Sequence, residues 1–193
     1  MAGVAGPMLQ RSKLQGTRFL LGLLVGGLGA AALLASIAYG LGELIAWAVP
    51  TLGRQIAAGL VLLVLGIADA RDRTWHVWRQ VPQAYVRKLA PGRLGLVWGF
   101  DLGLLFTTQK STSLTWGALV GVVLLAPSSA WLVLPGMTTV GMAVISVRSI
   151  WFMLTRPSWR GDRGRRWHGR VRLLSGAGLV VLAAAATAGA GWV

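Results

Sequence analysis

The sequence predicts an all-α protein, a polytopic bundle of five to six transmembrane helices in a single membrane domain covering residues 1–193. Hydrophobic residues make up 55% of the chain and charged residues 12%, and the mean hydropathy is +0.65. A soluble domain carries roughly 25% charged residues. Apolar segments of about 20 residues recur, and this length crosses roughly 30 Å of hydrocarbon as a helix. The segments are continuous and do not alternate, so membrane-spanning strands are not expected.

The positive charges are gathered beside the apolar segments. Of the 19 Lys and Arg residues, three precede the first segment, six lie between residues 71 and 93, and seven lie between residues 156 and 172. This is the positive-inside pattern, so we expect the N-terminal residues 1–18 to be cytoplasmic. Attraction of the basic loops to a bilayer with anionic lipids accounts for the net charge of +14. A nucleic-acid partner is not expected, because no soluble domain presents the charge.

The N-terminal part of the chain predicts two spans and a basic loop. Residues 19–49 form an uncleaved span, because their apolar character continues past the small residues that resemble a cleavage site. Residues 52–69 return, with Arg54 reaching the interface by snorkelling. The loop 70–93 places apolar residues every three or four positions among Arg and Lys, which predicts an amphipathic helix on the cytoplasmic membrane surface. Docking of a protein is the alternative for this loop.

Four apolar segments follow, at 94–107, 113–134, 137–155 and 173–192, with the Gly-rich basic loop 156–172 before the last. The first of them is short for a span and is expected either to cross or to re-enter. The second and third are expected to be hinged at Pro135-Gly136, and Pro127 is expected to kink the second.

Two topologies fit these segments. If all six span, three spans separate the loops 70–93 and 156–172, and seven positive residues face outward against the charge rule. If residues 94–107 dip in and return, both loops are cytoplasmic. Re-entrant backbone is tolerated where it is buried in protein or lines water. We favour five spans plus this short element, with six spans as the alternative.

A weak internal repeat is also present. The stretches AWAVP at 46–50 and AWLVLP at 130–135 are each followed by an apolar run and a basic loop that contains Trp. The repeat is consistent with two related halves, an organisation in which membrane proteins often place a site at broken helices.

Asp101 is the leading candidate for a functional side chain. A carboxylate in an apolar membrane segment costs on the order of 3 kcal/mol on insertion scales, so it should face protein or water and have a partner. Arg148, inside the apolar segment 137–155, is the expected partner, and Glu43 is a second acidic residue in the membrane zone. A structural pair of Asp101 and Arg148 is favoured over a role in proton or cation coupling.

Seven polar residues, 107–113, interrupt the apolar sequence after Asp101. Thr107, Thr108 and their neighbours surround the ammonium group of Lys110. They could line a polar cavity or coordinate a small anion. A solvated turn is the favoured interpretation.

Two further groups of residues have expected roles at surfaces. Small residues four apart let helices approach closely, and this predicts packing faces at Gly22, Gly26, Gly95, Gly99 and Gly103. Basic and aromatic side chains in the two loops are expected at the membrane interface, namely Trp75, Trp78, Arg79, Trp159, Arg165, Arg166 and Trp167.

No pattern of catalytic or cofactor-binding residues stands out. The chain has no cysteine, so disulfides and thiolate chemistry are excluded. His76 and His168 are far from any cluster with metal-ligand spacing, so no metal is expected. No nucleophile–base pair or phosphate-binding glycine loop is present. The chain is therefore not expected to be an enzyme or to hold a cofactor.

Three stretches carry a resemblance to a known family, namely RQVPQ from Arg79, GRLGLVWGFDLGLLFTT from Gly92 and SLTWGAL from Ser113. They resemble the CcdA/DsbD-like bacterial membrane proteins, which conduct reducing equivalents across the inner membrane by thiol–disulfide exchange. The resemblance implies about six helices in two related halves, each half with a broken helix that bears a Cys. Because this chain lacks cysteine, it implies a redox-inactive relative of that scaffold.

Two hypotheses for function follow. The favoured one is a non-enzymatic accessory or assembly subunit of the bacterial cytoplasmic membrane, with a membrane or cytoplasmic protein as partner. The alternative is a small transporter or a proton- or ion-coupled conduit that uses Asp101, Lys110 and Arg148 around a broken helix. The abundance of Ala and Gly, and of Arg over Lys, is typical of a high-GC bacterial genome.

Overall fold

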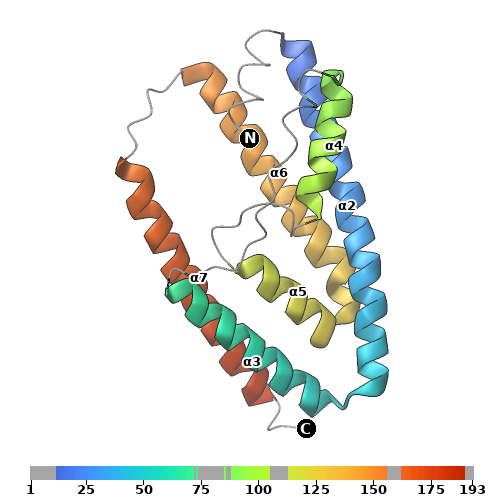
Figure 1. The fold of residues 1–193 in the computed structure, drawn as a ribbon, viewed down its shortest axis with the longest axis vertical. Coiled ribbons are helices and arrows are strands. Elements are labelled where there is room, and N and C mark those ends of the chain that lie inside the picture. The colour runs from blue at the N-terminus through green and yellow to red at the C-terminus, as the bar shows by residue number, and fades with distance from the viewer. Residues whose placement is uncertain are drawn as a thin grey trace. The chain divides into compact units, whose positions relative to one another are not determined.

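The computed structural model describes residues 12–71, 73, 85, 88–104, 113–155 and 162–189. Its elements are α2 (Lys13–Ala48), α3 (Thr51–Ala70), α4 (Pro91–Gly103), α5 (Leu114–Leu124), the 3₁₀ turn η2 (Pro127–Ser129), α6 (Ala130–Thr155) and α7 (Asp162–Gly189). Every regular element among the described residues is helical (Figure 1), which confirms the all-α prediction.

Three described helices are long and apolar enough to cross a membrane, namely Lys13–Ala48, Thr51–Ala70 and Pro127–Trp151. Leu114–Leu124 and Leu173–Ala188 are shorter apolar helices. Helix α4 has 13 residues and is therefore about 20 Å long, less than the roughly 30 Å of a hydrocarbon core.

The chain forms two compact units, each built from three separate stretches. The first unit takes residues 1–34, 77–109 and 135–159, and the second takes the stretches that lie between and after them. Helices α2 and α6 contribute residues to both units. The units are thus interleaved along the chain, and neither is one of two consecutive halves.

In the first unit, α2 and α4 run in the same direction and their backbones approach closely (Figure 1). Gly95 lies against the carbonyl group of Phe19, and Gly99, one turn later, lies against that of Leu23. Because the contacts advance together along both helices, the pair is parallel.

The glycines of α2 make the same contact from the other side. Gly22 lies against the carbonyl oxygen of Gly92, and Gly26 lies against that of Leu96. A Cβ atom at either glycine would overlap the backbone of α4. All five glycines expected at packing faces therefore lie in this one interface, with Gly103 against Gly27 at its end. Small residues at this spacing permit such backbone contact.

Side chains complete the first unit. Its core comprises Phe19, Leu23, Leu94, Trp98 and Met142. The rings of Phe19 and Trp98 meet edge to face, with their centroids 5.9 Å apart and their planes at 81°, an arrangement that aromatic pairs prefer.

Helix α6 runs opposite to α2 in the first unit. Gly27 lies against the side chains of Thr138 and Met142, whereas Thr17, ten residues earlier on α2, shares a groove with Ile150, later on α6. The groove between the two helices has a volume of about 400 Å³.

In the second unit, α3 and α7 lie side by side in opposite directions (Figure 1). A Cβ built on Gly66 would lie 3.0 Å from the carbonyl oxygen of Gly176, and one on Gly59 would lie 3.4 Å from that of Ala183. Leu62, Leu179 and Ala183 form the core between them. Gly117 brings α5 onto this core, because the side chain of Leu179 fills the space that a Cβ at Gly117 would need.

The hinge expected at Pro135-Gly136 is wrong, because α6 continues through Pro135. The break falls instead at Ala126, which has φ −145° and ψ 71° and precedes Pro127. A residue before proline is disfavoured in the helical region, which accounts for Ala126. Leu134 precedes Pro135 yet stays helical, and its side chain is completely buried. The packing of the buried Leu134 side chain outweighs the preference of a residue before proline for an extended backbone.

Two expected loop boundaries also differ. The segment 156–172 was expected to be a loop, but α7 begins at Asp162 and includes its last eleven residues. An acidic residue at the start of a helix is favoured by the helix dipole, and Arg is a good helix former. Helix α4 begins at Pro91, before the expected Leu94, and proline is well suited to a first helical position.

We expect Gly99→Ala to lower the free energy of unfolding by about 1–3 kcal/mol, because the new methyl group would overlap the backbone of Leu23, which has no freedom to move aside. Thermal unfolding in detergent measures the change. Gly141→Ala on α6 is the matched control, since nothing lies within 4 Å of that position. Equal stability of both variants and the parent would contradict the close α2–α4 contact.

Candidate functional site

A carboxylate is buried where three helices of the second unit meet. Asp69 is the last residue but one of α3, and its side chain is 2% exposed. A buried charge is costly unless hydrogen bonds compensate it. The surroundings of Asp69 supply this compensation.

Asp69 accepts hydrogen bonds from two serines on different segments. The backbone N–H of Ser113 donates to Oδ2 at 2.7 Å, and the hydroxyl of Ser113 donates to Oδ1 at 2.7 Å. The hydroxyl of Ser175, on α7, donates to Oδ2 at 2.9 Å. Both serines are buried as well. We call these three residues the Asp69 cluster.

Local sequence and helix packing together position the cluster. Ser113 is the N-cap residue of α5, and its own side chain caps no backbone group of that helix. The backbone N–H of Ser113 donates instead to Asp69, which belongs to α3 and lies outside α5. Ser175 reaches Asp69 because its neighbour Gly176 lets α7 approach closely, and a Cβ built on Gly176 would lie 3.6 Å from that of Asp69.

All three hydrogen bonds are donated to the carboxylate oxygens of Asp69. Because the donors belong to α7 and to the residue that begins α5, the side chain of Asp69 links these segments to α3.

The leading candidate from the sequence, Asp101, lies in the last turn of α4 and is 8% exposed. Arg148, its expected partner, is in α6 of the same unit and its side chain is exposed. Glu43 is exposed on α2. Thr107, Thr108 and Lys110 lie outside the described residues.

Two polar groups in the core of the first unit lack a hydrogen-bond partner among the described residues. They are the indole N–H of Trp98 and the hydroxyl of Thr138, and both side chains are buried. Trp98 and Asp101 are three residues apart on α4, so they share a face of the helix. Buried polar groups of this kind call for an explanation such as a water or an ion.

Most of the basic and aromatic residues expected at a membrane interface lie outside the part of the chain that the structure describes. Trp75, Trp78, Arg79 and Trp159 lie outside the described residues. Arg165, Arg166 and Trp167 have helical backbone within α7. Their expected place at a membrane interface stays a prediction.

Sequence reasoning missed the Asp69 cluster. The available signal was that Asp69 is an acidic residue at the very end of the apolar segment 52–69. An acidic residue in this position is equally typical of the start of a polar loop. Arg54 was expected to snorkel at an interface, yet it is half-buried and donates to the carbonyl oxygen of Leu124 on α5. Since Ser113 is at one end of α5 and Leu124 at the other, α5 runs opposite to α3.

No group of three or more His, Cys, Asp or Glu residues that could hold a metal ion occurs in the described part of the chain. Comparisons with protein-family models, with curated proteins and with solved structures found no match. The similarity to CcdA/DsbD-like proteins therefore rests on the quoted sequence stretches.

We expect Asp69→Ala to destabilise the protein by about 3 kcal/mol or more, since it leaves three buried donors without their acceptor. Ser175→Ala should cost less, about 1–2 kcal/mol, because it removes one hydrogen bond. Chemical denaturation in detergent measures both. Glu43→Gln, at an exposed position, should stay within about 0.5 kcal/mol of the parent. An Asp69→Ala variant as stable as Glu43→Gln would contradict the role of Asp69 in holding the three helices together.

Proposed function

We propose that the chain is a multi-pass protein of a bacterial cytoplasmic membrane in which an interrupted helix forms a polar path for protons or small cations. The observation that carries this proposal is the pair of short helices, α4 with 13 residues and α5 with 11 residues, on either side of a polar sequence. Each is short for a span. Asp101 lies just before the polar sequence, and Ser113, bound to Asp69, ends it.

Exposed apolar side chains support the membrane environment. Leu132 is 79% exposed, and Val147 and Val181 are each 66% exposed. Large apolar faces of this kind are unfavourable in water, and lipid tails solvate them. Three helices have the length and composition to cross a bilayer.

The charges of each unit support its orientation. In the first unit, Lys13 and Arg18 at the start of α2 share one end with Arg93 at the start of the parallel helix α4. In the second unit, Arg71 and Arg73 follow the end of α3 that meets Ser175 of α7, and the basic first turns of α7 precede that contact in the chain. Positive residues are retained on the cytoplasmic side, so each of these ends is cytoplasmic in the proposal.

The parallel contact of α4 with α2 supports re-entry from the cytoplasmic side. Helix α4 starts at the basic end of the first unit and reaches Gly27 of α2 with its last residue, Gly103. It is therefore about 20 Å deep at that point. The chain then resumes at Ser113, at the basic end of the second unit. With both basic ends cytoplasmic, α4 and α5 each begin on the cytoplasmic side in the proposal.

The proposal therefore has α4 as a re-entrant element and five crossings, α2, α3, α5, α6 and α7, of which α5 is short, with all basic segments cytoplasmic. In this arrangement Asp101 is the group that accepts and releases the proton, deep in the re-entrant helix. The unpartnered indole N–H of Trp98, on the same face of α4, is then a hydrogen-bonding position for water beside Asp101. Lys110, Thr107 and Thr108 follow Asp101 in the sequence and stay candidates from the sequence.

We expect Asp101→Asn to reduce proton flux by about a hundredfold or more, the lower end of what a positioned proton-transfer group contributes. The assay uses the purified chain in vesicles with an entrapped pH-sensitive dye and an imposed potassium diffusion potential. Glu43→Gln, a carboxylate loss at an exposed site, should leave flux unchanged.

Unchanged flux in Asp101→Asn, or no flux above that of empty vesicles in the parent, would count against the conduit. One observation favours the accessory or assembly subunit in that case. The three hydrogen bonds at Asp69 all fix one helix to another, which is a structural use of a carboxylate. A stable protein partner that co-purifies with the parent and with Asp101→Asn alike would then identify that role.

The topology makes a separate prediction, and the native chain helps because it has no cysteine. A membrane-impermeant thiol reagent should label Trp47→Cys, at the end of α2, in intact cells. Lys88→Cys and Gly161→Cys should react only after lysis. Labelling of Gly161→Cys from outside would instead establish six spans.

A further inference from the structure

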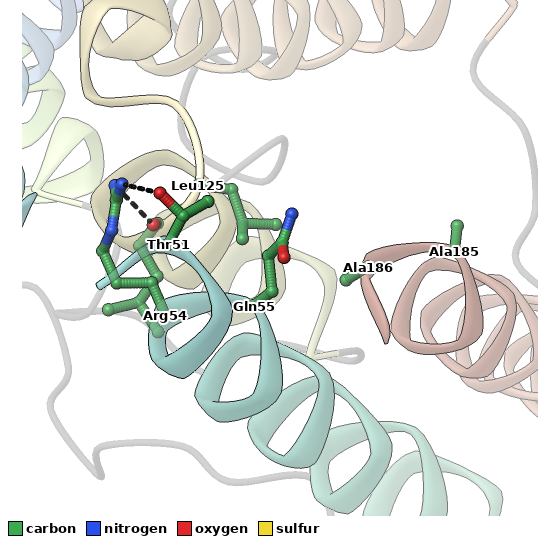
Figure 2. A pocket seen from close by; sticks show the side chains of 7 residues that line it. Thr51, Arg54, Gln55, Leu125, Ala185 and Ala186 are labelled. Atoms are coloured by element: carbon green, nitrogen blue, oxygen red, sulfur yellow. Dashed lines mark hydrogen bonds between the residues drawn. The ribbon is translucent and has the colours of Figure 1, made fainter. Parts of the chain in front are cut away.

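A small pocket lies in the second unit, at the end opposite the Asp69 cluster (Figure 2). It has a volume of about 180 Å³ and is formed by the first turn of α3, the last turn of α5 and the end of α7. Its lining residues are Thr51, Arg54, Gln55, Leu124, Leu125, Ala185 and Ala186. The residues from α3 are polar and those from α5 and α7 are apolar.

Arg54 is incompletely satisfied at this pocket. One terminal nitrogen donates to the hydroxyl of Thr51 at 3.2 Å, and the other donates to the carbonyl oxygen of Leu124 at 3.4 Å (Figure 2). Both distances are long for N–H···O hydrogen bonds. The Nε atom is buried and has no hydrogen-bond partner among the described residues.

The pocket offers Arg54 no negative charge. None of its seven lining residues is acidic, and a guanidinium group keeps its charge in proteins. Gln55 adds an amide to the lining, on the side of the pocket nearer Ala186 (Figure 2). A guanidinium group in a pocket that also carries the neutral polar side chains of Thr51 and Gln55 is complementary to an anion that accepts several hydrogen bonds.

We infer that this pocket binds a phosphate ester, supplied by the headgroup of an anionic phospholipid in the leaflet opposite the basic ends. Arg54 and Asp69 are fifteen residues apart on α3, or about 22 Å, so the pocket is at the other membrane surface if α3 spans. The volume corresponds to about six waters, enough for a phosphate with part of its glycerol. The rest of the lipid would meet an apolar wall formed by Leu125, Ala185 and Ala186. The inference is independent of proton conduction.

The test measures binding of dioctanoyl-phosphatidylglycerol to the full chain in a zwitterionic detergent by native mass spectrometry. We expect one tightly held lipid in the parent and at least tenfold weaker binding in Arg54→Gln. Arg71→Gln, which removes an exposed cation at the opposite end of α3, is the matched control and should bind like the parent. Inorganic phosphate serves as the competitor. If it displaces the lipid at equal concentration, free phosphate is the ligand of the same site.

Arg54 also holds Leu124, so Arg54→Gln could disturb α5. Ala186→Phe therefore provides a second variant, because it fills the pocket from α7 and leaves Arg54 in place. Ala188→Phe, at an exposed position outside the lining, is its control. Loss of lipid in Ala186→Phe alone supports the site. Parental lipid binding in both Arg54→Gln and Ala186→Phe would overturn it.

Discussion

The second unit depends on the carboxylate of Asp69, which lies on α3 and accepts hydrogen bonds from the first residue before α5 and from the middle of α7. In a medium without water, each of these groups would be costly if left alone, and together they satisfy one another. This contact determines where α5 begins and fixes the axial position of α7 along α3. Glycines 66 and 176 make it geometrically feasible, because a side chain at either position would separate the two helices.

The first unit is held by a different kind of contact. Its helices α2 and α4 meet backbone to backbone through glycines spaced four apart, and the aromatic pair of Phe19 and Trp98 packs beside them. In the proposed membrane setting there is little hydrophobic driving force between helices, and close van der Waals contact of this type would supply the attraction. The same contact makes α4 run with α2 and brings Asp101, in its last turn, into the interior.

These two contacts hold the helices that precede and follow the polar sequence 107–113 in the chain, and the proposed function depends on them. One anchors the helix before it and the other anchors the helix after it. In the sequence, the buried residue Asp101 precedes a segment that is rich in hydroxyl groups and carries Lys110. A helix break supported on both sides by fixed elements is the arrangement from which membrane proteins build polar paths. The expected structural pairing of Asp101 with Arg148 and the conduit are both uses of the same buried group.

The sequence by itself determined that the protein is helical, where its long apolar segments lie and which glycines form a packing face. Hydropathy and i, i+4 spacing are local properties, so they can be read along the chain. Only the tertiary structure decided that α2 and α4 are parallel, that α6 passes through Pro135, and that Asp69 joins three helices. The partners of Asp69 are 44 and 106 residues away. Whether a carboxylate lies at the start of a loop or holds helices together depends on the hydrogen-bond donors that tertiary packing brings close to it. A local sequence pattern carries no information about such distant donors.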